Sequence, residues 1–112
     1  MKKIIICLIL LSFIGLFSSQ TKIDSLENVL ENPKLTNRSE ILNSLAAEIL
    51  NSNPKRSLDL TEEALQLSPQ NSSEKPRALT YMALSYKEMN EYDKAAEVFD
   101  EALQAAEKID YK

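Results

Sequence analysis

Apolar residues recur every three or four positions through most of the chain after residue 20, between short runs rich in Pro, Asn and Ser. This spacing places the apolar side chains on one face of each segment, which is typical of amphipathic helices. Leu, Ala, Glu, Lys and Gln, which favour helices, dominate the same segments. The pattern predicts helices over residues 22–31, 37–51, 54–67, 74–89 and 92–109.

The ends of these helices are marked by residues with strong backbone preferences. Pro33 disfavours a helix at the residue before it, so we expect the first helix to stop there. Thr36, Asn53 and Ser73 are the expected N-caps of the next three helices. Pro54 suits a first helical position, where its missing N–H costs nothing. Because the joints are short, we expect successive helices to pack antiparallel.

Residues 1–20 have the layout of a secretory signal peptide. Two lysines precede an apolar run over residues 4–17, and two serines follow it. This run is shorter than the ~20 residues that a membrane span needs. We therefore expect cleavage after Ser19 or Gln20 and export of the rest to the periplasm or the extracellular space. An uncleaved leader is the alternative, and it would be the chain's only contact with a membrane.

Composition narrows the chemistry open to the exported part. Cys7 and Gly15 are the single Cys and the single Gly of the chain, and His and Trp are absent. After residue 20 there can be no Ser-His-Asp or Cys-His nucleophile, no His/Cys zinc site, no disulfide and no Gly-rich phosphate loop. Adjacent carboxylates such as Glu62 and Glu63 point about 100° apart on a helix and do not converge. We expect no catalytic activity, no cofactor and no metal.

The charge balance argues against nucleic acid as a partner. The formal net charge of the chain is −4. Two of its 13 Lys and Arg residues lie in the leader, so 11 remain against 17 Asp and Glu. Since binding to nucleic acid requires a basic surface, we expect none here.

The last two predicted helices echo the pair that precedes the loop at residues 68–73. In the later pair, apolar or small residues stand at the helix-facing positions Leu79, Met82, Ala83, Tyr86, Ala95, Phe99 and Ala102. The earlier pair has corresponding residues at Leu45, Ala46, Ile49 and Ala64. Ala46 precedes Ala83 by 37 residues, and Ala64 precedes Ala102 by 38. A nearly fixed period of this kind is typical of helical repeat proteins.

The later pair resembles the tetratricopeptide repeat, whose pattern is a bulky residue, x2, Leu, Gly or Ala, x2, Tyr, and then Ala, x3, Phe, x2, Ala. Ala95, Phe99 and Ala102 match this pattern. Ala83 stands at the Gly-or-Ala position, whereas Leu79 and Met82 replace the family's Trp and Leu. The resemblance implies an all-α fold of antiparallel helix hairpins stacked as a short right-handed solenoid. Together with the layout of the leader, it divides the chain into a signal peptide (1–20), a capping helix and joint (21–36), a degenerate repeat (37–73) and a repeat (74–112).

The small residues of the repeat have a physical reason. Ala83 and Ala95 allow the two helices of one hairpin to approach closely, and Tyr86 and Phe99 are expected to fill the gaps on either side. Ala102 is expected to leave room for a following repeat. The first predicted helix is expected to cover the second with the apolar face formed by Ile23, Leu26, Val29 and Leu30.

The last predicted helix is expected to leave apolar side chains uncovered at Val98, Ala105, Ala106 and Ile109. Three interpretations stay open: the sequence is a fragment of a longer protein, this helix associates with a second copy, or the exposed surface is small enough to be tolerated. The order of leader, cap and repeats resembles the exported N-terminal repeat region of bacterial sensor kinases and regulators.

In a solenoid of this kind the first helices of the repeats line a concave groove, so the resemblance implies a partner site there. The candidate groove residues are Arg77, Tyr81, Leu84, Lys87, Asn43 and Leu50. Arg77 and Tyr81 are the expected anchor pair, because Tyr and Arg dominate binding hot spots. We interpret the chain as an exported, non-catalytic interaction module that binds a protein or a peptide. The alternative is the N-terminal sensory or scaffold fragment of a longer membrane-bound kinase or transcription regulator.

Overall fold

The structure, a computed structural model, describes residues 20–110, and the regular elements in that range are all helices. Five helical segments follow one another: residues 20–30, α2 (Arg38–Ile49), α3 (Pro54–Leu67), α4 (Glu74–Glu88) and α5 (Tyr92–Asp110). The all-α prediction is confirmed, and α3 has the predicted bounds. The predicted signal peptide lies outside the described residues. Within residues 20–110, none of the helices combines the length and the apolar character that crossing a membrane requires.

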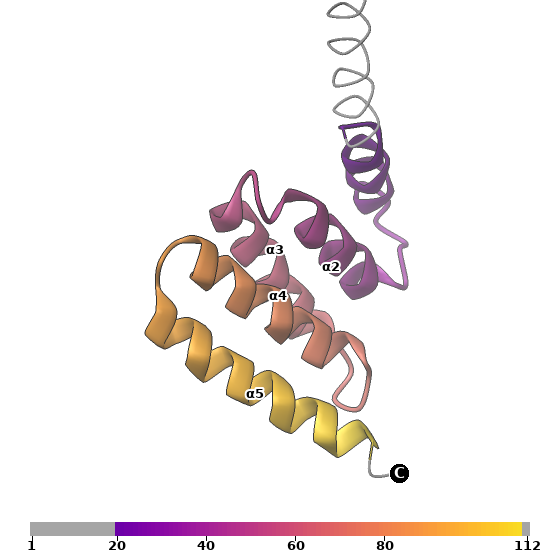
Figure 1. The fold of residues 1–112 in the computed structure, drawn as a ribbon. Coiled ribbons are helices and arrows are strands. Elements are labelled where there is room, and N and C mark those ends of the chain that lie inside the picture. Colours follow the sequence, from indigo (N-terminus) through magenta and orange to yellow (C-terminus); the bar gives the residue numbers. More distant parts are fainter. Residues whose placement is uncertain (1–19, 111–112) are drawn as a thin grey trace, which may run out of the picture.

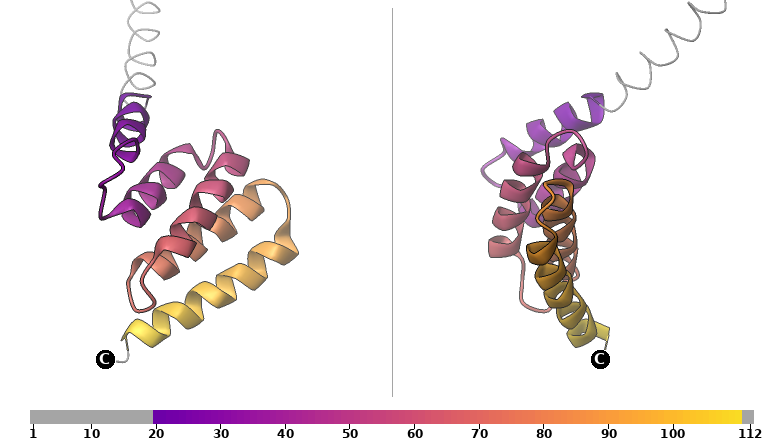
Figure 2. Two further views of the ribbon diagram at one scale, coloured as in Figure 1. Left: turned by 180° about the vertical axis from the view of Figure 1, so that it is seen from behind. Right: turned by 60° about the vertical axis from the view of Figure 1, so that its left-hand side comes forward.

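Successive helices pack against each other as hairpins. Close contacts join α2 to α3, α3 to α4 and α4 to α5, and a smaller set joins α2 to α4 (Figure 1). The helix at 20–30 lies at one end of this stack and α5 at the other, as both views in Figure 2 show. The arrangement confirms the predicted stack of hairpins.

The helix starts agree with the sequence in part. The side chain of Asn53 accepts a hydrogen bond from the backbone N–H of Arg56 at 3.2 Å, so this cap forms as expected. Ser73 is the N-cap of α4, but its side chain makes no capping hydrogen bond. The N-cap of α2 is Asn37, again without a side-chain bond, so the expected cap at Thr36 is wrong by one residue.

The turn between α4 and α5 is a tight reversal centred on Asn90. The N–H of Glu91 donates to the carbonyl oxygen of Tyr86 at 2.9 Å, and the N–H of Asn90 donates to that of Lys87 at 3.0 Å. These two bonds define a Schellman motif, in which the residue after the C-cap adopts a left-handed conformation. Asn90 does so with φ of 64°. Asn takes the place of the usual Gly because it tolerates this conformation better than other residues that carry a β-carbon.

The helix at 20–30 is joined to the stack by both polar and apolar contacts. Leu30 packs against the cluster of buried apolar residues formed by α2, α3 and α4. The Arg38 guanidinium donates to the Leu30 carbonyl oxygen at 2.8 Å. Ion pairs connect Lys22 with Glu48 on α2 and Glu27 with Arg56 on α3, both at 2.7 Å. These contacts hold this helix against the first hairpin.

Candidate functional site

The predicted packing residues are buried with two exceptions. Fully or nearly buried are Leu45, Ala46, Ile49, Ala64, Leu79, Met82, Ala83, Ala95 and Ala102. Tyr86 is half-buried, and Lys94 lies over its ring with 5.6 Å between the ammonium nitrogen and the ring centroid. Phe99, the second exception, is 38% exposed. The expectation that Phe99 fills a gap inside the hairpin therefore does not hold.

Each hairpin has small residues at the point of close approach. In the later hairpin these are Ala83 on α4 and Ala95 on α5, with 0% and 4% of their surface exposed. In the earlier hairpin Ser57 of α3 takes the second place, and its buried hydroxyl donates to the Ala46 carbonyl oxygen of α2 at 2.9 Å. A hydrogen bond thus replaces apolar contact, because a buried hydroxyl is costly unless it is bonded.

The uncovered face of α5 differs from the expected one. Val98 packs against the buried cluster of Leu79, Ala102 and Ala105. The expectation that Val98 and Ala105 are uncovered is therefore wrong. The exposed large apolar side chains on this helix are Tyr92, Phe99 and Leu103.

Arg77 on α4 is one of the residues expected to line a partner groove on the first helices of the hairpins. Its guanidinium lies over the ring of Tyr81, one turn further along α4, with 5.7 Å to the ring centroid. The same group donates to the Ser44 hydroxyl of α2 at 3.3 Å and lies 3.4 Å from a carboxylate oxygen of Glu74. We call Ser44, Glu74, Arg77 and Tyr81 the α2/α4 surface. All four are partly exposed.

The other groove candidates lie around this surface or away from it. Leu84 and Lys87 continue along α4 at three-residue steps from Tyr81, the first half-buried and the second exposed. Leu50 is half-buried at the C-cap of α2. The structure brings Arg77 and Tyr81 into contact.

Asn43 does not line a groove, which corrects the prediction. It is fully buried, and its side-chain amide donates to the backbone carbonyl and to a carboxylate oxygen of Glu74, at 3.2 and 2.8 Å. The first turn of α4 therefore lies over this position of α2. Asn43 joins the two hairpins and is inaccessible to a partner.

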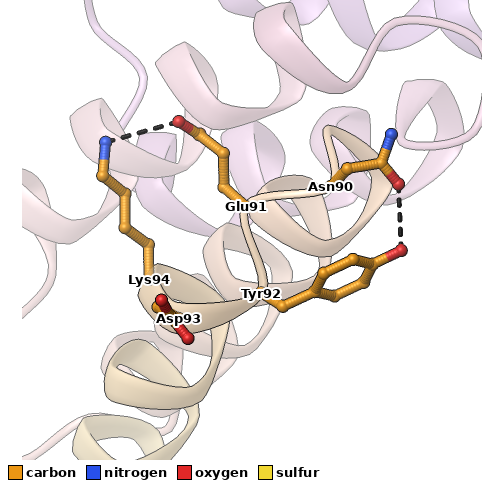
Figure 3. Close-up of a pocket in the computed structure, with 5 residues that line it drawn as sticks. All are labelled: Asn90, Glu91, Tyr92, Asp93 and Lys94. Atoms are coloured by element: carbon orange, nitrogen blue, oxygen red, sulfur yellow. Dashed lines mark hydrogen bonds and ion pairs between the residues drawn. The ribbon is translucent and has the colours of Figure 1, made fainter.

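A shallow depression of about 340 Å³ lies at the turn between α4 and α5 (Figure 3). Five consecutive residues, Asn90 to Lys94, line it, and four of them bond in pairs. The Tyr92 hydroxyl donates to the Asn90 side-chain oxygen at 2.9 Å, and Lys94 pairs with Glu91 at 3.4 Å. Across the described residues, no group of His, Cys, Asp or Glu is arranged to hold a metal ion. The depression is a feature of the turn.

Comparison with known families identifies the second hairpin. Residues 76–109 match the family model of the tetratricopeptide repeat. The match spans most of α4 and α5 and includes Arg77, Tyr81 and the buried alanines of this hairpin. No curated protein and no solved structure matches the chain.

The matched tetratricopeptide repeat indicates a protein-interaction module, since this family typically binds proteins and is typically non-catalytic. The match concerns the repeat alone and carries no link to sensor kinases or regulators. The resemblance to the repeat and the preference of hot spots for Tyr and Arg had singled out the Arg77–Tyr81 pair. The contribution of Ser44, which holds Arg77 from α2, has no signal in the sequence pattern.

Proposed function

We propose that the chain is an exported, non-catalytic module that binds a protein or a peptide at the α2/α4 surface. The observation that carries this proposal is the Arg77 guanidinium, which lies over Tyr81 and is bonded to both helices. Tyr and Arg are the residues most enriched at binding hot spots. A guanidinium held in place before binding loses little side-chain entropy when a partner arrives.

The surface offers a partner two kinds of contact. The partly exposed Tyr81 provides apolar ring area with a hydroxyl at its tip, and Arg77 provides a cation with donors to spare. Leu84 extends the apolar part along α4. A peptide with an aromatic or aliphatic residue next to an acceptor such as a carbonyl or a carboxylate suits this combination.

Export rests on the pattern of the first 20 residues, with two lysines, a run of apolar residues and two serines. The mass of the mature chain, purified from the periplasm or medium of a producing bacterium, tests it. A chain that begins at Gln20 or Thr21 supports export with cleavage. A full-length chain found in the cytoplasm overturns it.

Site-specific crosslinking tests the binding surface. A photoreactive phenylalanine analogue is placed at position 81 and, as a matched control, at the exposed position 62 on α3. We expect one partner protein to be crosslinked from position 81 and not from position 62. Equal crosslinking at both positions, or none at position 81, overturns the proposal.

Once that partner is purified, two variants measure the anchor pair. Arg77→Ala and Tyr81→Ala are each expected to weaken binding by about thirtyfold or more, the range of hot-spot residues. Glu62→Ala is the control, and we expect it to leave affinity unchanged. Thermal unfolding of each variant separates loss of binding from loss of fold.

A further inference from the structure

The apolar surface of α5 is wider than the part that its neighbours cover. At about 100° of rotation per residue, its apolar residues extend over about half of the helix circumference. Ala95, Ala102 and Ala105 are buried against α4, with Leu65 of α3 reaching the same cluster. Next to this covered part runs a second row of apolar residues, which we call the α5 seam: Tyr92, Ala96, Phe99, Leu103 and Ala106.

Four of the five residues of the α5 seam are exposed to solvent, and Ala106 is half-buried. Tyr92 is 62% exposed and Leu103 is 58% exposed, and Ala96 is also exposed. Its members alternate in steps of four and three residues, the spacing with which one helix packs along another in a coiled coil. The seam runs along α5 from Tyr92 to Ala106, a length of about 21 Å.

The equivalent row on α3 shows what kind of element such a seam accepts. Thr61 and Leu65 follow Ser57 by the same intervals at which Phe99 and Leu103 follow Ala95. Thr61 is fully buried, and Leu65 packs against the buried clusters that include Ala78 and Leu79 of α4. On α3 these positions are therefore covered by a helix. The same geometry on α5 fits a helix as well.

The charged residues beside the seam indicate which kind of helix it accepts. Asp93, Asp100 and Glu107 are spaced seven residues apart and form a continuous acidic row on the open side of the seam. All three are exposed, and within residues 20–110 none of them forms an ion pair. On α3 the corresponding positions are Lys55, Glu62 and Pro69, so this row is particular to α5. Residues that flank a coiled-coil seam decide partner choice by charge.

A second copy of the chain is a poor occupant. When two α5 helices pair antiparallel through the seam, the acidic row of one faces the acidic row of the other, because equivalent flanking positions meet. Like charges so close disfavour the pair. A parallel pair leaves each acidic row without a basic counterpart.

We propose that the α5 seam docks an amphipathic helix of another protein whose apolar stripe is flanked by Lys or Arg. Leu103 and Phe99 supply the apolar contact, and the row of Asp93, Asp100 and Glu107 pairs with the basic flank. This surface is separate from the α2/α4 surface, so the two proposals fail or succeed independently.

Two designed helical peptides test the seam with the full 112-residue chain. Both are about 21 residues long and carry Leu at the two core positions of three heptads. One carries Lys at the flanking positions and the other carries Glu. We measure binding by fluorescence anisotropy and expect the Lys-flanked peptide to bind at least about tenfold more tightly. Equal affinities overturn the proposal, and so does equal binding of a scrambled Lys-rich peptide.

Three variants assign the binding to the seam. Leu103→Gln is expected to lower the affinity for the Lys-flanked peptide by about tenfold or more. Leu67→Gln is the matched control, because Leu67 is similarly exposed but lies at the end of α3. The double variant Asp100→Lys with Glu107→Lys is expected to reverse the preference toward the Glu-flanked peptide. If Leu67→Gln weakens binding as much as Leu103→Gln does, the seam is not the site.

Sedimentation velocity of the same full-length chain tests directly whether two copies of it associate through the seam. We expect to find no dimer whose formation depends on the seam, that is, no dimer that the substitution Leu103→Gln dissociates into monomers. Such a dimer would mean that the seam is occupied by a second copy, and it would overturn the proposal. Because the substituted side chains are exposed, unchanged thermal unfolding of every variant is expected and excludes misfolding as the cause of lost binding.

Discussion

Thr61 on α3 and Phe99 on α5 occupy equivalent positions, four residues after the small residue at which each hairpin closes. Their environments are the reverse of what their side chains favour. Thr61 is fully buried and Phe99 is 38% exposed. The difference lies in the neighbour, since α4 covers α3, whereas in the described residues no helix covers the same face of α5. Burial at this position is set by the next element in the stack.

The two hairpins also fill their interiors with different chemistry. Beside its apolar residues, the earlier one buries the polar side chains of Ser39, Asn43, Ser57 and Thr61, whereas the later one buries Ser85 beside its alanines, Leu79 and Met82. Donated hydrogen bonds make the polar interior tolerable: Ser57 bonds across the hairpin, and Thr61 bonds the Leu58 carbonyl at 2.8 Å. The family match covers the later hairpin. One backbone arrangement thus admits two interiors.

The largest expected contrast is between a covered and an uncovered leucine. Leu45→Ala removes a fully buried side chain of the first hairpin and is expected to lower the free energy of unfolding by about 2–5 kcal/mol. Leu103→Ala on the α5 seam is expected to change it by about 0.5 kcal/mol or less. Urea unfolding followed by circular dichroism measures both. Equal losses would mean that Leu103 is covered in solution.

The next test substitutes Phe at a covered position of α3 and at an uncovered position of α5. Thr61→Phe overfills a site between α3 and α4 and is expected to cost about 1–3 kcal/mol. Leu103→Phe places a phenyl ring on the uncovered face of α5 and is expected to stay within about 0.5 kcal/mol. Differential scanning calorimetry of both variants decides. A neutral Thr61→Phe would show that the α3/α4 contact yields easily to a larger side chain.

The turns of the two hairpins differ in backbone strain. Asn90→Ala places a β-carbon without a polar side chain in a left-handed conformation, and we expect a loss of about 1–2 kcal/mol. Asn90→Gly, which suits this conformation, is expected to retain stability. The control is Asn51→Ala in the earlier turn, where φ is not positive. Equal unfolding midpoints for Asn90→Ala and Asn51→Ala would contradict the role of Asn90.

The smallest expected effect concerns the hydrogen bond across the first hairpin. Ser57→Ala gives this hairpin the small apolar residue of the second and removes the bond to the Ala46 carbonyl. We expect a loss of about 0.5–1.5 kcal/mol. Ser52→Ala removes a hydroxyl bond in the exposed turn and is expected to cost less. Chemical unfolding at several denaturant concentrations resolves the two, and a neutral Ser57→Ala would leave this bond without a stabilising role.

Much of the helical layout could be predicted from the chain itself. The bounds of α3 were predictable because the residues that set them lie next to its ends. Asn53 caps its first turn, Pro54 occupies its first position, and a polar loop follows Leu67. The small pair Ala83 and Ala95 indicated a close approach of two helices, since few other constraints place Ala at both positions. These signals are short-range, so they survive without knowledge of the neighbours.

The candidate site was predictable only where one helix contains it. Arg77 and Tyr81 are four residues apart on α4, so their contact follows from helical geometry. The burial of Asn43 does not, because it depends on how the first turn of α4 crosses α2. The contact of Arg77 with Ser44 has the same origin.

The sequence alone therefore determined the number of helices in the described region, where most of them begin and end, and which side of each is apolar. Only the tertiary structure decided how much of each apolar side is covered. On α5 the apolar residues extend around about half of the helix, and periodicity cannot tell which part meets α4. Packing places Ala102 and Ala105 against the stack and leaves Leu103 exposed, because a neighbouring helix can cover only one strip of so wide a surface.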